Sequence, residues 1–102
     1  MLATDDEDAL ERFREIVRFP SVSGVGNGSY RKCAVWIRQQ LDDIQIAHEQ
    51  IGQSPDKPIV IATIPGTEPQ LPSVLLNSHY DVVPAMLDHW ICDPFAAEIR
   101  SG

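Results

Sequence analysis

The sequence predicts an α/β domain in which two helices are followed by a mixed sheet. Two segments near the amino terminus carry apolar residues at helical spacing, and the runs after them are short, apolar and rich in β-branched residues. Stretches rich in glycine and proline separate these segments. Because two amphipathic helices cannot bury their apolar faces alone, we expect both to pack on the sheet.

The first predicted helix begins near Thr4 and ends before Pro20. Thr4 and Glu7 form a capping-box pattern, in which two side chains satisfy backbone donors at a helix start. The helix ends here because the residue before a proline is driven away from helical geometry. The residues of its apolar face are Leu10, Phe13 and Val17, with Ala9 and Ile16 beside them.

The second predicted helix covers residues 30–43 and follows a glycine-containing loop at 21–29. Its apolar residues recur every fourth position, which is typical of an amphipathic helix. These residues are Cys33, Ile37 and Leu41. Trp36 flanks them, and we expect it to lie in the core between helix and sheet.

Strands are expected after the helices. Residues 44–52 alternate between apolar and polar types, which predicts a half-exposed edge strand with His48 facing solvent. Continuous apolar runs at 59–64 and 73–78 predict two strands that are covered on both faces, and 95–100 begins a further strand. The linkers between the early strands are shorter than a helical crossover, so these strands should meander antiparallel.

Composition excludes several classes of partner. The formal net charge is −7, and no cluster of Lys and Arg exists that could bind a nucleic-acid backbone. No apolar stretch reaches the roughly 20 residues that span a bilayer, and the acidic amino terminus is unlike a signal peptide. We therefore expect a soluble, cytoplasmic protein without nucleic-acid or membrane partners, in which Cys33 and Cys92 remain reduced thiols.

The candidate functional residues are His79 and Asp81, in the sequence Asn-Ser-His-Tyr-Asp-Val-Val-Pro. On extended backbone, residues two positions apart point to the same side, whereas Tyr80 points to the other side and is expected to pack, or else to line the cleft. Zinc binds neutral imidazole, and a neighbouring carboxylate fixes the tautomer and raises ligand basicity. A surface hydrogen-bonded pair is the alternative, because zinc needs at least three protein ligands and no second one lies nearby in the sequence.

A family resemblance is carried by segment 65–84, which reads Pro-Gly-Thr-Glu-Pro-Gln-Leu-Pro-Ser-Val-Leu-Leu-Asn-Ser-His-Tyr-Asp-Val-Val-Pro. This segment resembles the aminoacylase-1 branch of the aminoacylase/carboxypeptidase family of di-zinc metallopeptidases. The likeness continues in His-Trp-Ile-Cys-Asp-Pro-Phe at 89–95. Phe-Pro-Ser-Val-Ser at 19–23 resembles the loop after the first helix in the wider family.

The resemblance implies a fold and a set of residue roles. Under it, residues 1–102 are the amino-terminal part of a zinc-peptidase-type catalytic domain, truncated and without the lid and dimerisation domain. His79 is a ligand to one of two zinc ions, and Asp81 is counted with the catalytic residues as the carboxylate that braces this histidine. The bridging Asp, the general-base Glu and the other ligands would follow Gly102.

The activity implied by the resemblance is zinc-dependent hydrolysis of N-acyl-L-amino acids to a carboxylate and a free amino acid. The substrate is a small molecule, and a homodimer is expected for intact relatives only. Because one histidine cannot replace a full ligand set, we expect this chain alone to be inactive. Two alternatives stay open: a dipeptidase or carboxypeptidase of the same family, and a non-catalytic domain that binds a partner through an exposed apolar face.

Overall fold

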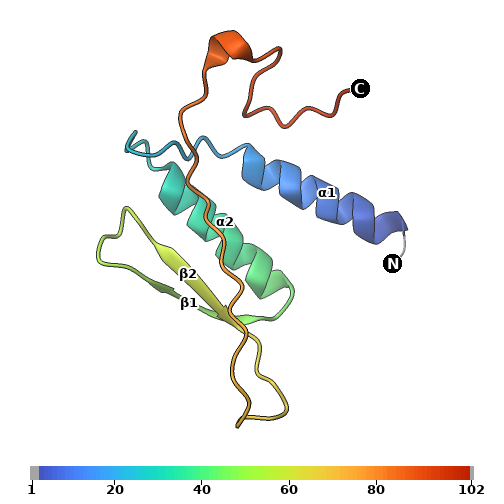
Figure 1. Ribbon diagram of the computed structural model, residues 1–102, viewed down its shortest axis with the longest axis vertical. Coiled ribbons are helices and arrows are strands. Elements are labelled where there is room, and N and C mark those ends of the chain that lie inside the picture. Colours follow the sequence, from blue (N-terminus) through green and yellow to red (C-terminus); the bar gives the residue numbers. More distant parts are fainter. Residues whose placement is uncertain (1–2, 102) are drawn as a thin grey trace.

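The computed structural model describes residues 3–101 and contains two helices followed by a β-hairpin (Figure 1). The elements are α1 (Ala3–Val17), α2 (Ser29–Asp43), β1 (Ala47–Ile51), β2 (Ile59–Thr63) and a short 3-10 helix, η1 (Leu87–His89). The predicted order of two helices and then strands is confirmed, but the sheet has two antiparallel strands instead of a larger mixed set. Within residues 3–101, no helix is both long and apolar enough to cross a membrane.

Helix α1 is stabilised on its surface by charge. Glu11 accepts hydrogen bonds from Arg14 at 2.7 Å and from Arg18 at 3.0 Å. The hydrogen bond from Arg18, with the charges of both arginines, holds the pKa of the Glu11 carboxyl below its ordinary value. The side chain of Thr4 lies outside the described residues, so the capping box stays a prediction.

The carboxyl end of α1 packs against α2 through Trp36. The indole Nε1 of Trp36 donates to a Glu15 carboxylate oxygen at 2.9 Å, and its ring lies 6.1 Å from that of Phe19, centroid to centroid. The prediction that Trp36 lies between helix and sheet is therefore wrong. The indole is directed toward the end of α1, while Cys33, one turn earlier on α2, lies in the core.

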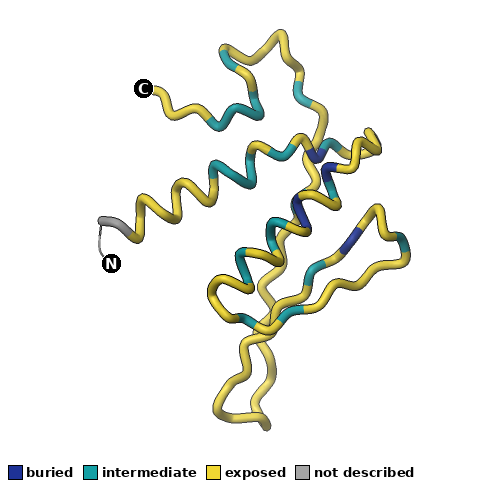
Figure 2. Tube along the Cα trace, turned by 180° about the vertical axis from the view of Figure 1, so that it is seen from behind, coloured by how far each residue is buried: buried dark blue, intermediate teal, exposed yellow. Residues whose placement is uncertain are grey.

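The core lies where α2 packs on both strands of the hairpin. Cys33 and Ala34 are 0% exposed, and Figure 2 shows that burial elsewhere is sparse. Burial raises the pKa of the Cys33 thiol to about 11, so this side chain is a protonated, apolar-like group at neutral pH. Both cysteines are free, as the sequence predicts.

The hairpin pairs Ala47 with Thr63 and Ile51 with Ile59, which confirms the antiparallel pairing for the first two of the expected strands. Strand β1 begins later than predicted because the chain turns sharply after α2, where Gln45 has a positive φ of 59°. His48 is also not solvent-facing: its side chain is 8% exposed. Its Nδ1 lies 2.9 Å from the Ile46 carbonyl oxygen, and its Nε2 lies 3.5 Å from an Asp42 carboxylate oxygen.

Three predictions about strands are wrong. β2 forms, but its residues are not covered on both faces, since Ile59 and Ile61 are exposed. Segment 73–78 is extended without being a strand, and 95–100 is irregular. An apolar run becomes a strand only when a neighbour accepts and donates its backbone hydrogen bonds, and within residues 3–101 no such neighbour lies along either segment.

The raised pKa of Cys33 predicts a loss of stability in alkali. The unfolded thiol loses its proton near pH 9.0, whereas the folded thiol keeps it to about 11, so the folded state is fully favoured below pH 9.0. The free energy of unfolding should fall as the pH rises through this window, by at most about 1.4 kcal/mol per pH unit. Urea unfolding across the same pH range measures this slope.

Cys33→Ala is the control for this prediction. The variant should be less stable overall but should lack the slope that begins at pH 9.0. In the native chain, the half-buried Cys92 should react with a thiol reagent well before Cys33. Equal reaction rates for the two thiols would contradict the burial of Cys33.

Candidate functional site

A parallel bridge between Val22 and Val82 positions the candidate site. The Ser23 amide donates to the Val82 carbonyl oxygen at 2.8 Å, and the Val82 amide donates to the Ser21 carbonyl oxygen at 2.9 Å. After the long loop that follows β2, the chain thus returns in extended form to the segment that joins α1 to α2 (Figure 1). The bridge brings residues 21–23 beside residues 80–82, which are far apart in the sequence.

Ser21 and Tyr80 anchor this bridge to the rest of the fold. Ser21 is 2% exposed, and its hydroxyl donates to the Tyr80 carbonyl oxygen at 2.6 Å. The Tyr80 hydroxyl donates to the carbonyl oxygen of Pro58, at the start of β2. The Tyr80 ring also meets Tyr30 of α2 edge-on, with the centroids 5.7 Å apart. The packing predicted for Tyr80 is therefore confirmed, and burial is the main cause that raises its pKa.

His79 and Asp81 are in direct contact. The Nδ1 atom of His79 lies 2.8 Å from the Asp81 carbonyl oxygen and 3.1 Å from the Asp81 Oδ1 atom. Both of these oxygens accept hydrogen bonds, so Nδ1 carries the hydrogen of the neutral ring. The lone pair then lies on Nε2, and the side chain is 82% exposed. The arrangement offers Nε2 as an electron-pair donor at the surface of the molecule.

Ser23 is the partner that sequence reasoning missed. Its hydroxyl donates to the Asp81 Oδ2 atom at 2.9 Å, so each carboxylate oxygen of Asp81 has a different partner. The motif at 19–23 drew attention to this segment, but nothing in the local sequence places it against Asp81. The contact is created by the bridge between Val22 and Val82.

A largely apolar cleft of about 510 Å³ lies beside His79. It separates the end of α1 from the segment after Asp81, and His79 is the imidazole among its lining residues. Its apolar lining includes Ile16, Phe19, Val82, Met86, Trp90 and Phe95. A cleft of this size and polarity accommodates the apolar part of a small molecule next to the ring.

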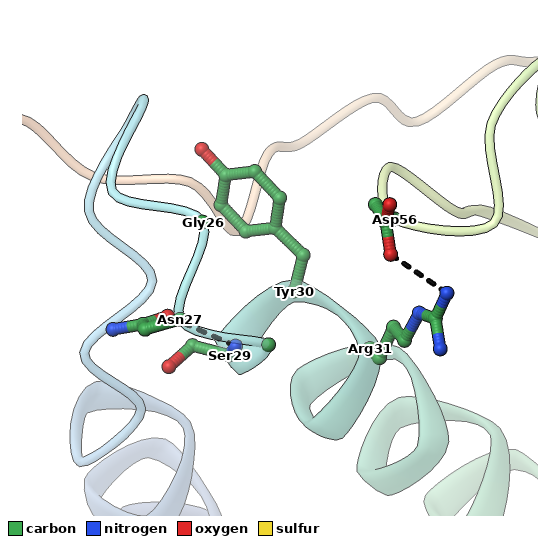
Figure 3. Close-up of a pocket in the computed structure, with 7 residues that line it drawn as sticks. Gly26, Asn27, Ser29, Tyr30, Arg31 and Asp56 are labelled. Carbon is green, nitrogen blue, oxygen red and sulfur yellow. Dashed lines mark hydrogen bonds and ion pairs between the residues drawn. The ribbon is translucent and has the colours of Figure 1, made fainter.

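A smaller pocket of about 260 Å³ lies at the amino end of α2 (Figure 3). Two pairs of its polar groups are bonded to each other. Arg31 forms an ion pair with Asp56 at 2.7 Å, and Asn27 accepts a hydrogen bond from the Ser29 amide at 3.0 Å. These contacts explain the pocket as the turn that starts α2 and its link to the hairpin.

The described residues supply one well-placed donor for a metal ion. Nowhere between residues 3 and 101 do three or more His, Cys, Asp or Glu side chains gather to form a metal site. Cys33 is buried and protonated, and His48 is held by Ile46 and Asp42. Among residues 3–101, His79 is thus the side chain whose donor chemistry fits zinc, and the described residues contain no further ligands gathered around it.

Comparison with known proteins gives consistent relatives, although no family model matches the chain. Mouse aminoacylase-1 is 38% identical over 92 residues, which cover 90% of this chain and 22% of the relative. Human aminoacylase-1 is 30% identical over 93 residues, which cover 91% of this chain and 22% of the relative. Aminoacylase-1 of Dictyostelium discoideum is 41% identical over 68 residues, which cover 67% of this chain and 16% of the relative.

These relatives are acylases, so the chain is related to a class of hydrolytic enzymes. More specifically, its homologues at 30–41% identity are aminoacylase-1 proteins. The resemblance seen in segment 65–84 is thus confirmed. The chain spans about a fifth of the length of the curated relatives that it matches, 22% for the mouse and human proteins.

Tyr80→Phe tests the anchor of the site. The variant keeps the ring contact with Tyr30 but loses the hydrogen bond to the Pro58 carbonyl, so the free energy of unfolding should fall by about 1 kcal/mol. Tyr30→Phe is the matched control and should change it by less than about 0.5 kcal/mol. Chemical denaturation of the three proteins measures the difference. Equal losses in both variants would show that the hydrogen bond contributes nothing specific.

Proposed function

We propose that this chain contributes part of the catalytic centre of a zinc-dependent aminoacylase, with His79 as a ligand to one zinc ion and Asp81 as its brace. The observation that carries the proposal is the orientation of the imidazole. Nδ1 is held by two oxygens of Asp81, so in the neutral ring the lone pair lies on Nε2, beside an apolar cleft. The similarity to aminoacylase-1 then supports the reaction class.

The donor chemistry of His79 fits zinc. Zinc binds neutral imidazole nitrogen, and histidine ligands commonly donate their second ring N–H to a carboxylate or a backbone carbonyl, both of which Asp81 provides. When bound, zinc supplies a Lewis acid that polarises an amide carbonyl and activates water. The remaining ligands and the general base would come from the part of the relatives' length that this chain does not span.

The proposed substrate is an N-acyl-L-amino acid, which is hydrolysed to a carboxylate and a free amino acid. The names of the relatives favour this substrate over the peptides cleaved by dipeptidases or carboxypeptidases. The apolar lining beside His79 is compatible with an acyl group or an aliphatic side chain. The role of this chain's own residues is to orient one ligand and to form one wall of the cleft.

A non-catalytic interaction domain is the second candidate. The observation that favours it is the apolar surface of the extended segment, where Val74, Leu75 and Leu76 are exposed by 86%, 87% and 91%. Exposed apolar patches of several hundred Å² mark interaction surfaces. The two candidates differ in what they require of His79, since a docking domain has no need of its imidazole.

The experiment that separates them uses a chimera. This chain replaces the matching 92 residues of mouse aminoacylase-1, and turnover of N-acetylmethionine and bound zinc are measured. The chimera should hydrolyse the substrate, and His79→Asn should remove activity and lower the zinc content. Asp81→Asn should lower zinc affinity by about 10- to 100-fold, as expected for a group that orients a ligand.

The 102-residue chain by itself should show no turnover with added zinc and should bind zinc weakly. Circular dichroism establishes that each chimera is folded before its activity is compared. Zinc content and turnover unaffected by His79→Asn in a folded, active chimera would reject the proposed role and favour the interaction domain.

A further inference from the structure

We propose that Ser23 is a positioning residue that fixes the Asp81 carboxylate and, through it, the tautomer of His79. This inference rests on the proposed role of His79 as a metal ligand, and it assigns a role to a residue outside the pair. Ser23 touches neither the imidazole nor the cleft, so it acts through Asp81 alone.

The geometry divides the two oxygens of Asp81 between two partners. Oδ2 accepts the Ser23 hydroxyl at 2.9 Å, and Oδ1 lies 3.1 Å from His79 Nδ1. The terminal torsion of an aspartate is broad, so the carboxylate plane is not fixed by rotamer preference. A donor on one oxygen and the ring N–H on the other specify that plane. Without the hydroxyl, only the contact with His79 would orient the group.

Ser23 is itself held in place by the backbone. Its amide donates to the Val82 carbonyl at 2.8 Å, immediately after Asp81 in the chain. The position of the hydroxyl is therefore set by a backbone hydrogen bond of the same residue. This matters because both side chains are exposed and water competes for the same oxygens.

The orientation of the Asp81 carboxylate affects Nε2, the second nitrogen of the His79 ring. A well-oriented Oδ1 favours hydrogen on Nδ1, which leaves the lone pair on Nε2 for a metal ion. Loss of the Ser23 hydroxyl should raise the share of the other tautomer, with hydrogen on Nε2. The effect on metal affinity should be smaller than that of losing Asp81, because Ser23 lies one contact further away.

The test uses the full 102-residue chain and a pair of variants that differ by one hydroxyl. Ser23→Thr keeps the hydroxyl donor, whereas Ser23→Val has the shape of threonine without the hydroxyl, and both are β-branched, so they differ at this turn position only in the donor. Nitrogen-15 resonances of the His79 ring, recorded with the imidazole neutral, report the tautomer. Zinc added stepwise to the same samples reports relative affinity through the shift of these resonances.

Ser23→Thr should match the native chain. Ser23→Val should lose part of the Nδ1–H population and weaken zinc binding by about two- to fivefold, below the 10- to 100-fold typical of direct partners of a ligand. Ser78→Ala, which removes an exposed hydroxyl beside His79 with no partner among the described residues, should change neither quantity. Amide resonances of Val22 and Val82 show whether the bridge is intact in each variant.

The outcomes separate the two proposals. If Ser23→Val keeps the native tautomer while the bridge is intact, the positioning role of Ser23 is overturned whatever zinc does. The metal-ligand role fails separately if His79→Asn leaves the zinc content of the folded chimera unchanged, and the link from Ser23 to zinc affinity then fails with it. A tautomer shift in Ser23→Val that Ser23→Thr lacks, accompanied by weaker zinc binding, supports both. Should Ser23→Val lose the bridge, Ser23→Ala is measured against Ser23→Thr by the same criteria.

Discussion

Two backbone hydrogen bonds between residues 21–23 and 80–82 are the constraint on which the candidate site depends. They join the loop after α1 to a segment that has no secondary structure of its own. Ser21 and Ser23 lie on either side of the bridge, and their hydroxyls hold the backbone of Tyr80 and the carboxylate of Asp81 respectively. One short pairing thus sets both the path of the chain and the direction of the imidazole.

The bridge is connected to a very small core. Tyr80 reaches Pro58 and Tyr30, and these belong to the hairpin and to α2, whose contact buries Cys33 and Ala34. A histidine that is itself exposed is in this way linked to the most buried part of the molecule through one tyrosine. Side chains alternate on extended backbone, so His79 and Asp81 face the surface and contact each other, while Tyr80 between them faces inward and packs.

The sequence correctly predicted the features that depend on interactions between residues close together in the chain. Helical spacing placed both helices, and short linkers fixed the antiparallel hairpin, because these features depend on neighbours a few residues away. The strand at 73–78 was predicted wrongly. An apolar run indicates that a segment tends to be buried, but it does not show whether another strand lies beside it to form backbone hydrogen bonds. The contact between Ser23 and Asp81 joins residues 58 positions apart, so it follows from the fold and not from spacing. The roles proposed for His79 and Asp81 rest on a family likeness, whereas their mutual contact is seen in the structure.

The uncovered segment around Val74, Leu75 and Leu76 has a practical consequence. This segment exposes apolar side chains, and its backbone has no strand partner among the described residues. Strand β2 has a second edge that pairs with no other strand of the described sheet. Surfaces of this kind recruit strands from neighbouring molecules. Self-association, more than unfolding, should therefore limit the solubility of the chain. A charged residue in place of one of these apolar residues should raise the solubility.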